Sequence, residues 1–237
     1  PISAVERKEG DAPQVLRRMP TGIGGLDQVL HGGLFRCGVY MVMGRPGTGK
    51  TTLGNQVAFN HAASGGHAIF LTLLTDSHDR MLAGMQAMAF YDPQALFTRI
   101  SYLSAYHVLE SEGLPGLLKL LRESLREQAA TLLVIDGVVT AEAAAPSELD
   151  LKKFLHELQV LGELFGCTTL LLTGSRGDAD AHYAERTMVY GILHLTSEAH
   201  GSRATRYVEI LKRRGSDGLH GRHAFTICAA GISVYPR

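Results

Sequence analysis

Apolar residues in this chain fall into two alternating patterns, short unbroken runs and longer stretches with helical spacing. Unbroken runs of strand length are typical of strands buried on both faces of a sheet. The stretches between them place apolar residues three and four positions apart, which predicts helices with one face against a core. The clearest helices run from Leu114 to about Gln128 and from Ser147 onward. The predicted buried strands cover residues 39–43, 68–74, 100–103, 131–136 and 168–173. Strands that alternate with helices favour an α/β fold with a parallel sheet.

Two further features complete the predicted outline of the chain. Three short apolar segments near the C-terminus, residues 191–195, 207–211 and 224–227, are separated by turn-rich stretches and predict antiparallel hairpins that extend the sheet. We expect residues 18–237 to form a single domain and residues 1–17, which are polar and aperiodic, to be a mobile leader. Before the first buried strand, Thr21 is a candidate N-cap for a short helix. A methionine-rich helix with Met81, Leu82, Met85 and Met88 on one face is expected to pack on the core, and residues 91–93 would end it.

Composition excludes several classes of protein. The chain has 237 residues, 45% of them hydrophobic, with 23 basic and 23 acidic residues, so no global charge attracts nucleic acid or a membrane. No apolar run is long enough to span a bilayer, and the first residues lack the apolar core of a signal peptide. Its three cysteines match no metal-binding or redox spacing, which favours a reduced, cytoplasmic setting.

The strongest chemical signal is the stretch from Gly44 to Thr51, which reads G-x-x-x-x-G-K-T between a predicted strand and a predicted helix. This is the phosphate-binding P-loop pattern in the context that the pattern requires. Its glycines let backbone N–H groups wrap a phosphate, Lys50 supplies a positive charge to the β- and γ-phosphates, and the Thr51 hydroxyl is a ligand for Mg²⁺. The sequence therefore predicts binding of a nucleoside triphosphate, with contacts from Gly44, Arg45, Pro46, Gly47, Thr48, Gly49, Lys50, Thr51 and Thr52.

A second candidate metal ligand lies at the end of a buried strand. Four apolar residues, 132–135, deliver the carboxylate of Asp136 to the edge of the sheet. In P-loop enzymes an acid in this place helps to hold Mg²⁺, directly or through water. At the end of another central strand, Thr173 and Ser175 are polar groups that could sense the γ-phosphate or satisfy strand-end backbone groups.

Residues 21–34 read T-G-I-x-G-L-D-x-x-L-x-G-G-L and precede the P-loop strand and G-x-P-G-T-G-K-T-T. This arrangement resembles the KaiC-like branch of the RecA-type ATPases, and the resemblance extends from about Arg18 to the C-terminus. It implies a three-layer α/β/α RecA-like fold, ATP as the nucleotide and Mg²⁺ as the cofactor. It also implies self-assembly, most simply into a hexameric ring, with a role in signalling or regulation beside a protein partner.

The chain departs from this family where the catalytic base is expected. KaiC-like proteins carry two adjacent glutamates at the end of the strand that follows the P-loop helix, and aligning on Ser77 places Thr75 and Asp76 there. A threonine cannot serve as a carboxylate base. Three interpretations stay open: Asp76 acts as the base, hydrolysis is slow, or the protein mainly binds nucleotide. We favour slow hydrolysis that involves Asp76.

A basic segment near the C-terminus, residues 212–216, resembles the family's K-x-R-G-S segment. In the family its lysine and arginine reach the γ-phosphate bound by the neighbouring subunit, which implies that Lys212 and Arg214 act in trans in an oligomer. Charge that builds on the γ-phosphoryl oxygens gives such cations a catalytic role. The alternative is a basic hairpin tip that aids solubility or touches nucleic acid.

Two other classes of function compete with an ATPase ring. A RecA-type DNA recombinase or helicase motor would need DNA-binding loops, but their usual site, residues 174–183, holds one arginine and two aspartates, which suits phosphate contacts poorly. DNA is therefore not favoured as a partner. An ATP-gated regulatory scaffold with negligible turnover is favoured by the missing first glutamate.

Overall fold

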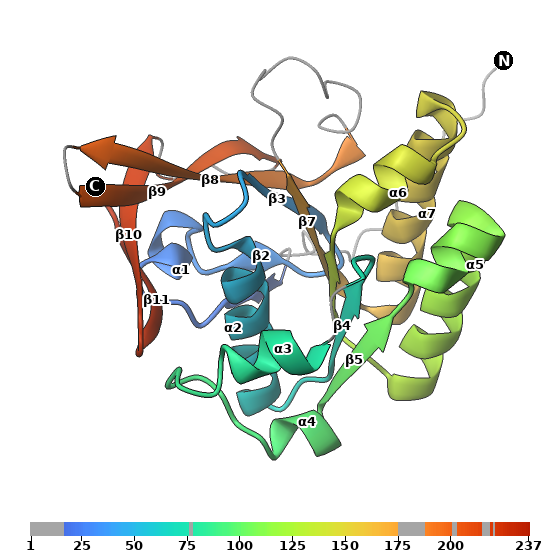
Figure 1. Ribbon diagram of the computed structural model, residues 1–237, viewed down its shortest axis with the longest axis horizontal. Helices are drawn as coiled ribbons and strands as arrows, with labels where there is room; N and C mark the ends of the chain where they lie inside the picture. The colour runs from blue at the N-terminus through green and yellow to red at the C-terminus, as the bar shows by residue number, and fades with distance from the viewer. Residues whose placement is uncertain (1–16, 76–77, 175–187, 201–202, 215–218, 220) are drawn as a thin grey trace, which may run out of the picture.

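The computed structural model describes residues 17–75, 78–174, 188–200, 203–214, 219 and 221–237. Within them, nine strands form one sheet in the order β11-β10-β9-β8-β3-β7-β6-β4-β5, and β1 and β2 pair separately (Figure 1). The six strands from β8 to β5 run parallel, and β9, β10 and β11 continue the sheet in antiparallel fashion. The strands are β1 (Arg18–Met19), β2 (Leu34–Phe35), β3 (Val39–Gly44), β4 (Ala68–Thr72), β5 (Ile100–Ser104), β6 (Leu132–Asp136), β7 (Thr168–Gly174), β8 (Gly191–His200), β9 (Arg203–Arg213), β10 (Arg222–Cys228) and β11 (Gly231–Tyr235).

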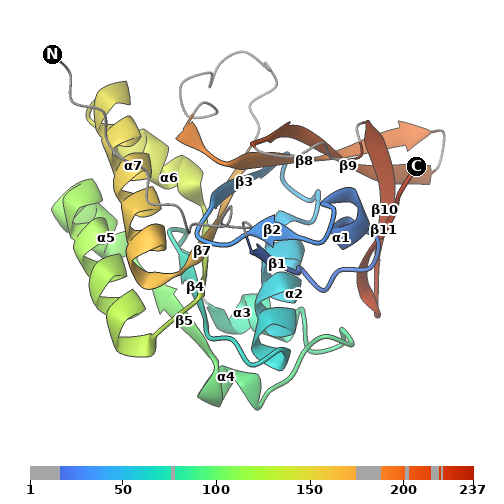
Figure 2. The ribbon, with the colours of Figure 1, turned by 180° about the vertical axis from the view of Figure 1, so that it is seen from behind.

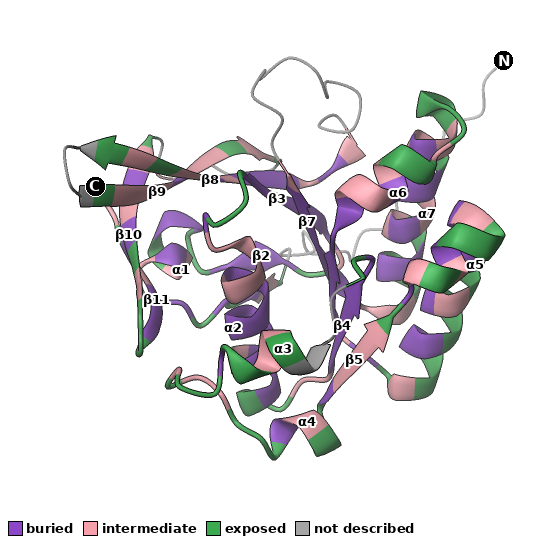
Figure 3. Cartoon of the chain, viewed as in Figure 1, coloured by how far each residue is buried: buried purple, intermediate pink, exposed green. Residues whose placement is uncertain are grey.

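Helices cover both faces of the parallel strands, so the fold is the expected three-layer α/β/α arrangement (Figures 1 and 2). On one face lie α1 (Leu26–Val29), α2 (Lys50–Ala63), α3 (His78–Ala83) and α4 (Ala95–Thr98), and on the other α5 (Tyr106–Gln128), α6 (Val138–Ala144) and α7 (Glu148–Phe165). Each face has its own cluster of buried apolar side chains, and residues of β3, β6 and β7 contribute alternately to both clusters. Every residue of β3 and β6 is buried, and so is β7 apart from its last residue, as the unbroken apolar runs predict; Figure 3 shows this for β3 and β7. Among the described helices, none combines the length and the apolar character that a membrane crossing requires.

The parallel register brings the carboxyl ends of the central strands to one edge of the sheet. Gly44 at the end of β3 pairs with Gly174 at the end of β7, and Asp136 at the end of β6 pairs with Thr72 and Leu172. In open α/β sheets ligands bind at this edge, because loops and helix N-termini gather there. The fold therefore places the P-loop and the strand-end acid side by side.

The predicted C-terminal hairpins are present, but the first of their strands has a second role. β8 pairs in parallel with β3, from Tyr40↔Gly191 to Gly44↔Leu195, before the chain turns back as β9. β8 thus belongs to the central parallel sheet and also begins the antiparallel extension. The sequence analysis did not identify β11, whose alternation over residues 231–235 is short and follows a tight turn at Ala229 and Ala230.

Three local predictions differ from the structure. Thr21 does not cap α1, which begins at Leu26 after Gly25; instead, the Asp27 carboxylate accepts hydrogen bonds from the Thr21 hydroxyl at 2.7 Å and the Thr21 N–H at 2.8 Å. α3 ends at Ala83 rather than before residues 91–93, and turns follow it, although Met85 is still buried.

The third difference is at the start of α5, which begins at Tyr106 instead of Leu114. Gly113 (φ 66°, ψ −160°) separates two helical segments within α5, and the predicted start matches the second segment. By contrast, the N-cap of α7 is confirmed, because the Ser147 side chain accepts a hydrogen bond from the Asp150 N–H. The predicted inward face of α7 is also confirmed, since the following residues are all buried: Leu151, Phe154, Leu155, Leu158 and Leu161.

Candidate functional site

The P-loop connects the end of β3 to the start of α2 and has the backbone conformation that an anion-binding loop needs. Gly47 (φ 82°) and Gly49 (φ 101°) lie in the left-handed region, and Gly49 is the N-cap of α2. Gly44 has an extended backbone, and a glycine is needed there because neighbouring atoms pack closely against it. A Cβ at Gly44 would lie 2.6 Å from both the Leu195 carbonyl oxygen and the Thr48 hydroxyl. The 14-residue helix α2 directs its N-terminal N–H groups toward the loop, which favours a bound phosphate.

Lys50 folds back over the loop. Its Nζ donates hydrogen bonds to the carbonyl oxygens of Gly44 at 2.8 Å and Arg45 at 3.1 Å. Burial lowers the pKa of Lys50, and the nearby Asp136 carboxylate opposes that shift. The ammonium group is therefore partly desolvated and gains from any additional negative charge placed beside the loop.

Thr51 and Asp136 meet at the edge of the sheet although they are far apart in the sequence. The Thr51 hydroxyl donates a hydrogen bond of 2.7 Å to Asp136 Oδ2, and Asp136 is 6% exposed. Burial raises the pKa of Asp136, while the hydrogen bonds from Thr51 and the Gly137 N–H, and the charge of Lys50, act in the opposite direction. A buried carboxylate that is incompletely compensated is suited to a cation.

A cavity of about 490 Å³ opens beside this pair. Its volume lies within the range of small-molecule sites, roughly 300–1,000 Å³. Apolar side chains from four separate segments of the chain complete its wall. The sequence analysis did not identify them, because an apolar residue gives no local signal of a binding site. They are Leu74, Val139, Leu172 and, from β10, Ile227, whose Cδ1 lies 2.5 Å from the position of a Cβ on Gly49.

The predicted base lies outside the described residues, since these do not include Asp76 or Ser77. Thr75, which stands where the family has its first glutamate, is exposed. Its neighbour Leu74 lines the cavity and packs against Gly137. The segment that follows β4 therefore reaches the cavity through Leu74.

Lys212 and Arg214 lie far from the P-loop of their own chain. Gly191 of β8 pairs with Arg213 of β9 and with Tyr40 of β3, so the basic segment lies level with the amino end of β3. Gly44 is four positions after Tyr40, or about 13 Å along the strand. The two cations therefore lie toward the opposite edge of the sheet from the phosphate loop.

Arg213, between these two cations, is anchored in the fold. Its guanidinium donates to the Leu30 carbonyl oxygen and lies 5.8 Å from the centre of the Phe35 ring. Burial, and then the neighbouring Arg214, lower the pKa of Lys212.

Thr173, the candidate phosphate sensor, donates a hydrogen bond of 3.0 Å to Glu142 Oε1 of α6. It is thus engaged on the face of the sheet that α5, α6 and α7 cover. Ser175, the other candidate, lies outside the described residues.

A phosphate-binding loop at the end of the first parallel strand, with a strand-end acid beside it, defines the P-loop class of α/β proteins. Comparison with known proteins gives the family within that class. A model of the KaiC ATPase family matches residues 19–237, and the chain therefore belongs to the KaiC ATPase family.

Relatives and solved structures agree with this assignment. A UPF0273 protein of Thermotoga maritima is 25% identical over 94% of this chain and 97% of its own length. The circadian clock oscillator protein KaiC of Rippkaea orientalis is 25% identical over all of this chain, which spans 47% of that protein. A crystal structure of a KaiC-like protein from Pyrococcus horikoshii superposes with a TM-score of 0.80 at 25% identity, covering 93% of this chain and 100% of that one.

Proposed function

We propose that this chain is an ATP-binding KaiC-like domain, spanning residues 18–237, which binds ATP with Mg²⁺ in the cavity beside the P-loop. The observation that carries the proposal is the 2.7 Å contact between the Thr51 hydroxyl and the Asp136 carboxylate next to the Lys50 ammonium. A hydroxyl and a carboxylate are the hard oxygen ligands that Mg²⁺ prefers. Because Thr51 donates its proton to Asp136, its oxygen lone pairs remain available to a cation.

Each group then has a defined task. The N–H groups of the loop and of the first turn of α2 hold the phosphates, and Lys50 leaves the carbonyl oxygens of Gly44 and Arg45 to contact the β- and γ-phosphates. Bound Mg²⁺ would supply positive charge to the β- and γ-phosphate oxygens. Leu74, Val139 and Ile227 exclude water from one side of the cavity, which strengthens the electrostatic interactions inside it.

We further propose that hydrolysis is slow and that Asp76 orients or deprotonates the attacking water. The exposed Thr75 has no carboxylate, so the nearest acid in the sequence is one position later and one methylene shorter than the family's glutamate. A base displaced from its best position costs rate steeply, because catalysis depends on alignment.

The proposal includes a ring in which Lys212 and Arg214 act on the nucleotide of a neighbouring subunit. Their position toward the opposite edge of the sheet supports this assignment. A cation level with the amino end of β3, about 13 Å from the P-loop end of that strand, is poorly placed for its own site. A role in signalling or regulation with a protein partner belongs to the same proposal.

Phosphate release measured on the full chain with ATP and Mg²⁺ tests this function. We expect slow release by the wild type, none above background for Lys50→Ala, and a decrease for Asp76→Ala, with Lys119→Ala on the exposed face of α5 as a charge-matched control for Lys50→Ala. Light scattering with and without ATP should show an assembled species. A strictly monomeric protein with undiminished hydrolysis would contradict the trans role of Lys212 and Arg214.

The second candidate is an ATP-gated regulatory module with negligible turnover, which the threonine at position 75 favours. It predicts tight, Mg²⁺-dependent ATP binding by the wild type with phosphate release no greater than that of Lys50→Ala. Binding and release measured on the same sample separate the two candidates.

A further inference from the structure

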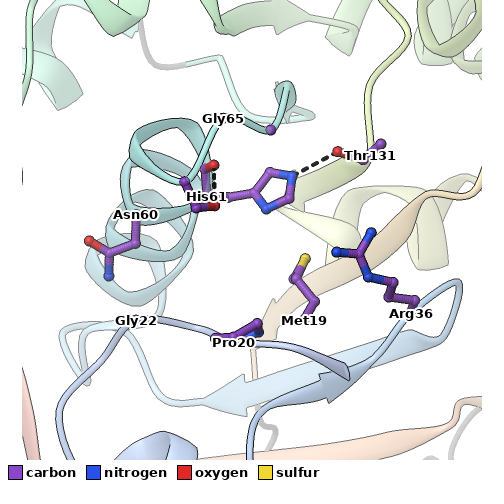
Figure 4. Close-up of a pocket in the computed structure, with 10 residues that line it drawn as sticks. Met19, Pro20, Gly22, Arg36, Asn60, His61, Gly65 and Thr131 are labelled. Carbon is purple, nitrogen blue, oxygen red and sulfur yellow. Dashed lines mark hydrogen bonds between the residues drawn. The ribbon is translucent and has the colours of Figure 1, made fainter. Parts of the chain in front are cut away.

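A second cavity, of about 390 Å³, lies at the other end of α2 from the P-loop (Figure 4). α2 runs from Lys50 to Ala63, which separates its two ends by about 20 Å. The cavity is bounded by the last turn of α2, the strand β1 with the residues that follow it, and the segment that leads into β6. It shares no lining residue with the cavity beside the P-loop.

One wall of this cavity carries a buried imidazole with a ring nitrogen turned inward. His61 is 7% exposed, and its Nε2 lies 2.8 Å from the Thr131 hydroxyl. The other ring nitrogen, Nδ1, has no hydrogen-bond partner among the described residues, and Figure 4 shows it directed toward the side of the cavity formed by Met19 and Pro20. A nitrogen in this position is satisfied only by solvent or by a ligand.

The opposite wall carries a cation. Arg36, in the turn between β2 and β3, is exposed, and Figure 4 shows its guanidinium reaching toward His61 and Thr131. Its backbone N–H donates to the Arg17 carbonyl oxygen, but its guanidinium makes no hydrogen bond or ion pair with any residue that the structure describes. A guanidinium presents a fork of donors that matches a phosphate or carboxylate group, so Arg36 is equipped to bind an anion at two points.

The electrostatic surroundings favour negative charge. The pKa of His61 is lowered by burial first and then by two charged or titratable groups that act on it, Arg36 from the turn before β3 and His67 from the loop after α2. The carbonyl end of α2 would oppose an anion. Several carbonyl groups at this end are engaged, however: the Asn60 and Ala62 oxygens accept from the N–H groups of Ser64 and Gly65, and the His61 oxygen accepts from Ser64 Oγ at 2.7 Å. After the helix, the Gly65 oxygen accepts from the Arg99 guanidinium at 2.6 Å.

We propose that this cavity is a second ligand site, which binds the tetrahedral oxyanion group of a small molecule between Arg36, His61 and Thr131. The volume exceeds that of the oxyanion alone, and the side chains of Met19 and Pro20 offer an apolar surface to an organic part of the ligand. A phosphomonoester of a small metabolite fits this description better than a free inorganic anion. The site goes beyond nucleotide binding and does not depend on it.

Anion affinity at the proposed site should depend on pH, and the charges around His61 fix the direction of that dependence. A bound oxyanion offsets the effect of Arg36 and His67 on the imidazole, so the pKa of His61 is higher in the complex than in the free protein. Binding therefore takes up a proton, and affinity increases as pH falls through the interval between the two pKa values. Sulfate tests this cleanly because it does not titrate near neutral pH.

Backbone NMR of the full chain locates the binding, with the Lys50→Ala variant used to suppress anion binding at the P-loop. Titration with sulfate and with glycerol 3-phosphate should shift the amide signals of Arg36, His61 and Thr131, and the phosphomonoester should bind more tightly. Arg36→Gln should weaken binding at least tenfold. Arg122→Gln, which removes an exposed arginine of α5 on the other face of the sheet, should leave it unchanged.

Two outcomes would overturn the proposal. One is a titration in which both anions shift only P-loop signals, and the other is an Arg36→Gln variant that binds as well as the wild type. His61→Gln gives a second reading, because glutamine keeps a polar group at the site but cannot titrate. Its sulfate affinity should change less between pH 5 and pH 7 than that of the wild type, and an undiminished pH dependence would exclude His61 as the proton acceptor.

Discussion

Replacing Asp136 by asparagine should separate the stability of the fold from the binding of nucleotide. In the ligand-free protein the Asp136 carboxylate is 6% exposed, and burial raises its pKa despite the hydrogen bonds from Thr51 and Gly137. Ionised Asp136 is therefore a net cost to the folded state. Asparagine removes the buried charge and keeps one oxygen that can accept the Thr51 hydroxyl.

The expected change in the free energy of unfolding follows from two opposed quantities. Exchanging a charge-assisted hydrogen bond for a neutral one loses about 1 kcal/mol. Removing the uncompensated charge returns about 1.4 kcal/mol for every unit by which burial raises the pKa. Because the net pKa shift is upward, we expect Asp136→Asn without ligand to be more stable than wild type by up to about 1 kcal/mol, or roughly 2–4 °C in Tm for a chain of this size.

The stability of the two proteins should also depend differently on pH. With a raised pKa, native Asp136 binds its proton more tightly than the unfolded chain does, so this group's contribution to stability is present at low pH and is lost as pH rises through the raised pKa. The variant lacks this loss. The advantage of Asp136→Asn should therefore grow as pH rises from the ordinary aspartate range toward neutrality.

With Mg²⁺ and ATP the order should reverse. A ligand at 100 times its Kd stabilises a protein by about 2.7 kcal/mol, whereas a variant that binds 100-fold more weakly gains only about 0.4 kcal/mol at the same concentration. Thermal melts of both proteins, with and without Mg²⁺ and ATP, measure these four combinations at pH 5 and again at pH 8. A ligand-free variant that is more than about 1 kcal/mol less stable than wild type at pH 8, or one with a full ATP-induced shift, would refute the reasoning.

Three further predictions concern the scaffold. Ser147→Ala removes the N-cap of α7 and should cost about 1 kcal/mol in chemical unfolding, whereas Ser147→Asp should restore most of the loss. Gly25→Ala should cost several kcal/mol or prevent folding, since φ is 77° and the new Cβ would lie 1.9 Å from the Val234 carbonyl oxygen; Gly24→Ala, where nothing lies within 4 Å, is the matched control. Tyr102→Phe leaves Oδ1 of the fully buried Asn55 without its 2.6 Å hydrogen bond and should cost about 1–3 kcal/mol, and a loss below 0.5 kcal/mol would contradict this role.

Much of the architecture was predictable because its signals are local. The buried strands around Asp136 and Thr173 read as unbroken apolar runs, and Ser147 marks the start of α7 by its own capping chemistry. The N-cap prediction for Thr21 failed because a competing contact with a residue six positions later decides the conformation. Thr21 is a residue type that often caps a helix, but its hydroxyl donates to the Asp27 carboxylate instead, and Gly25 is the N-cap of α1.

The sequence by itself determined the P-loop, the candidate metal ligands and the family, because these depend on residue types at fixed spacing along one strand, one turn and one helix. Only the tertiary structure decided which distant groups meet. It brought Thr51 within 2.7 Å of Asp136, closed the cavity with Ile227 from β10 and placed Lys212 level with the amino end of β3. It also set Arg36 across a second cavity from His61, at the far end of the helix that begins with Lys50. Strand order and register fix these contacts, and neither can be read from local periodicity.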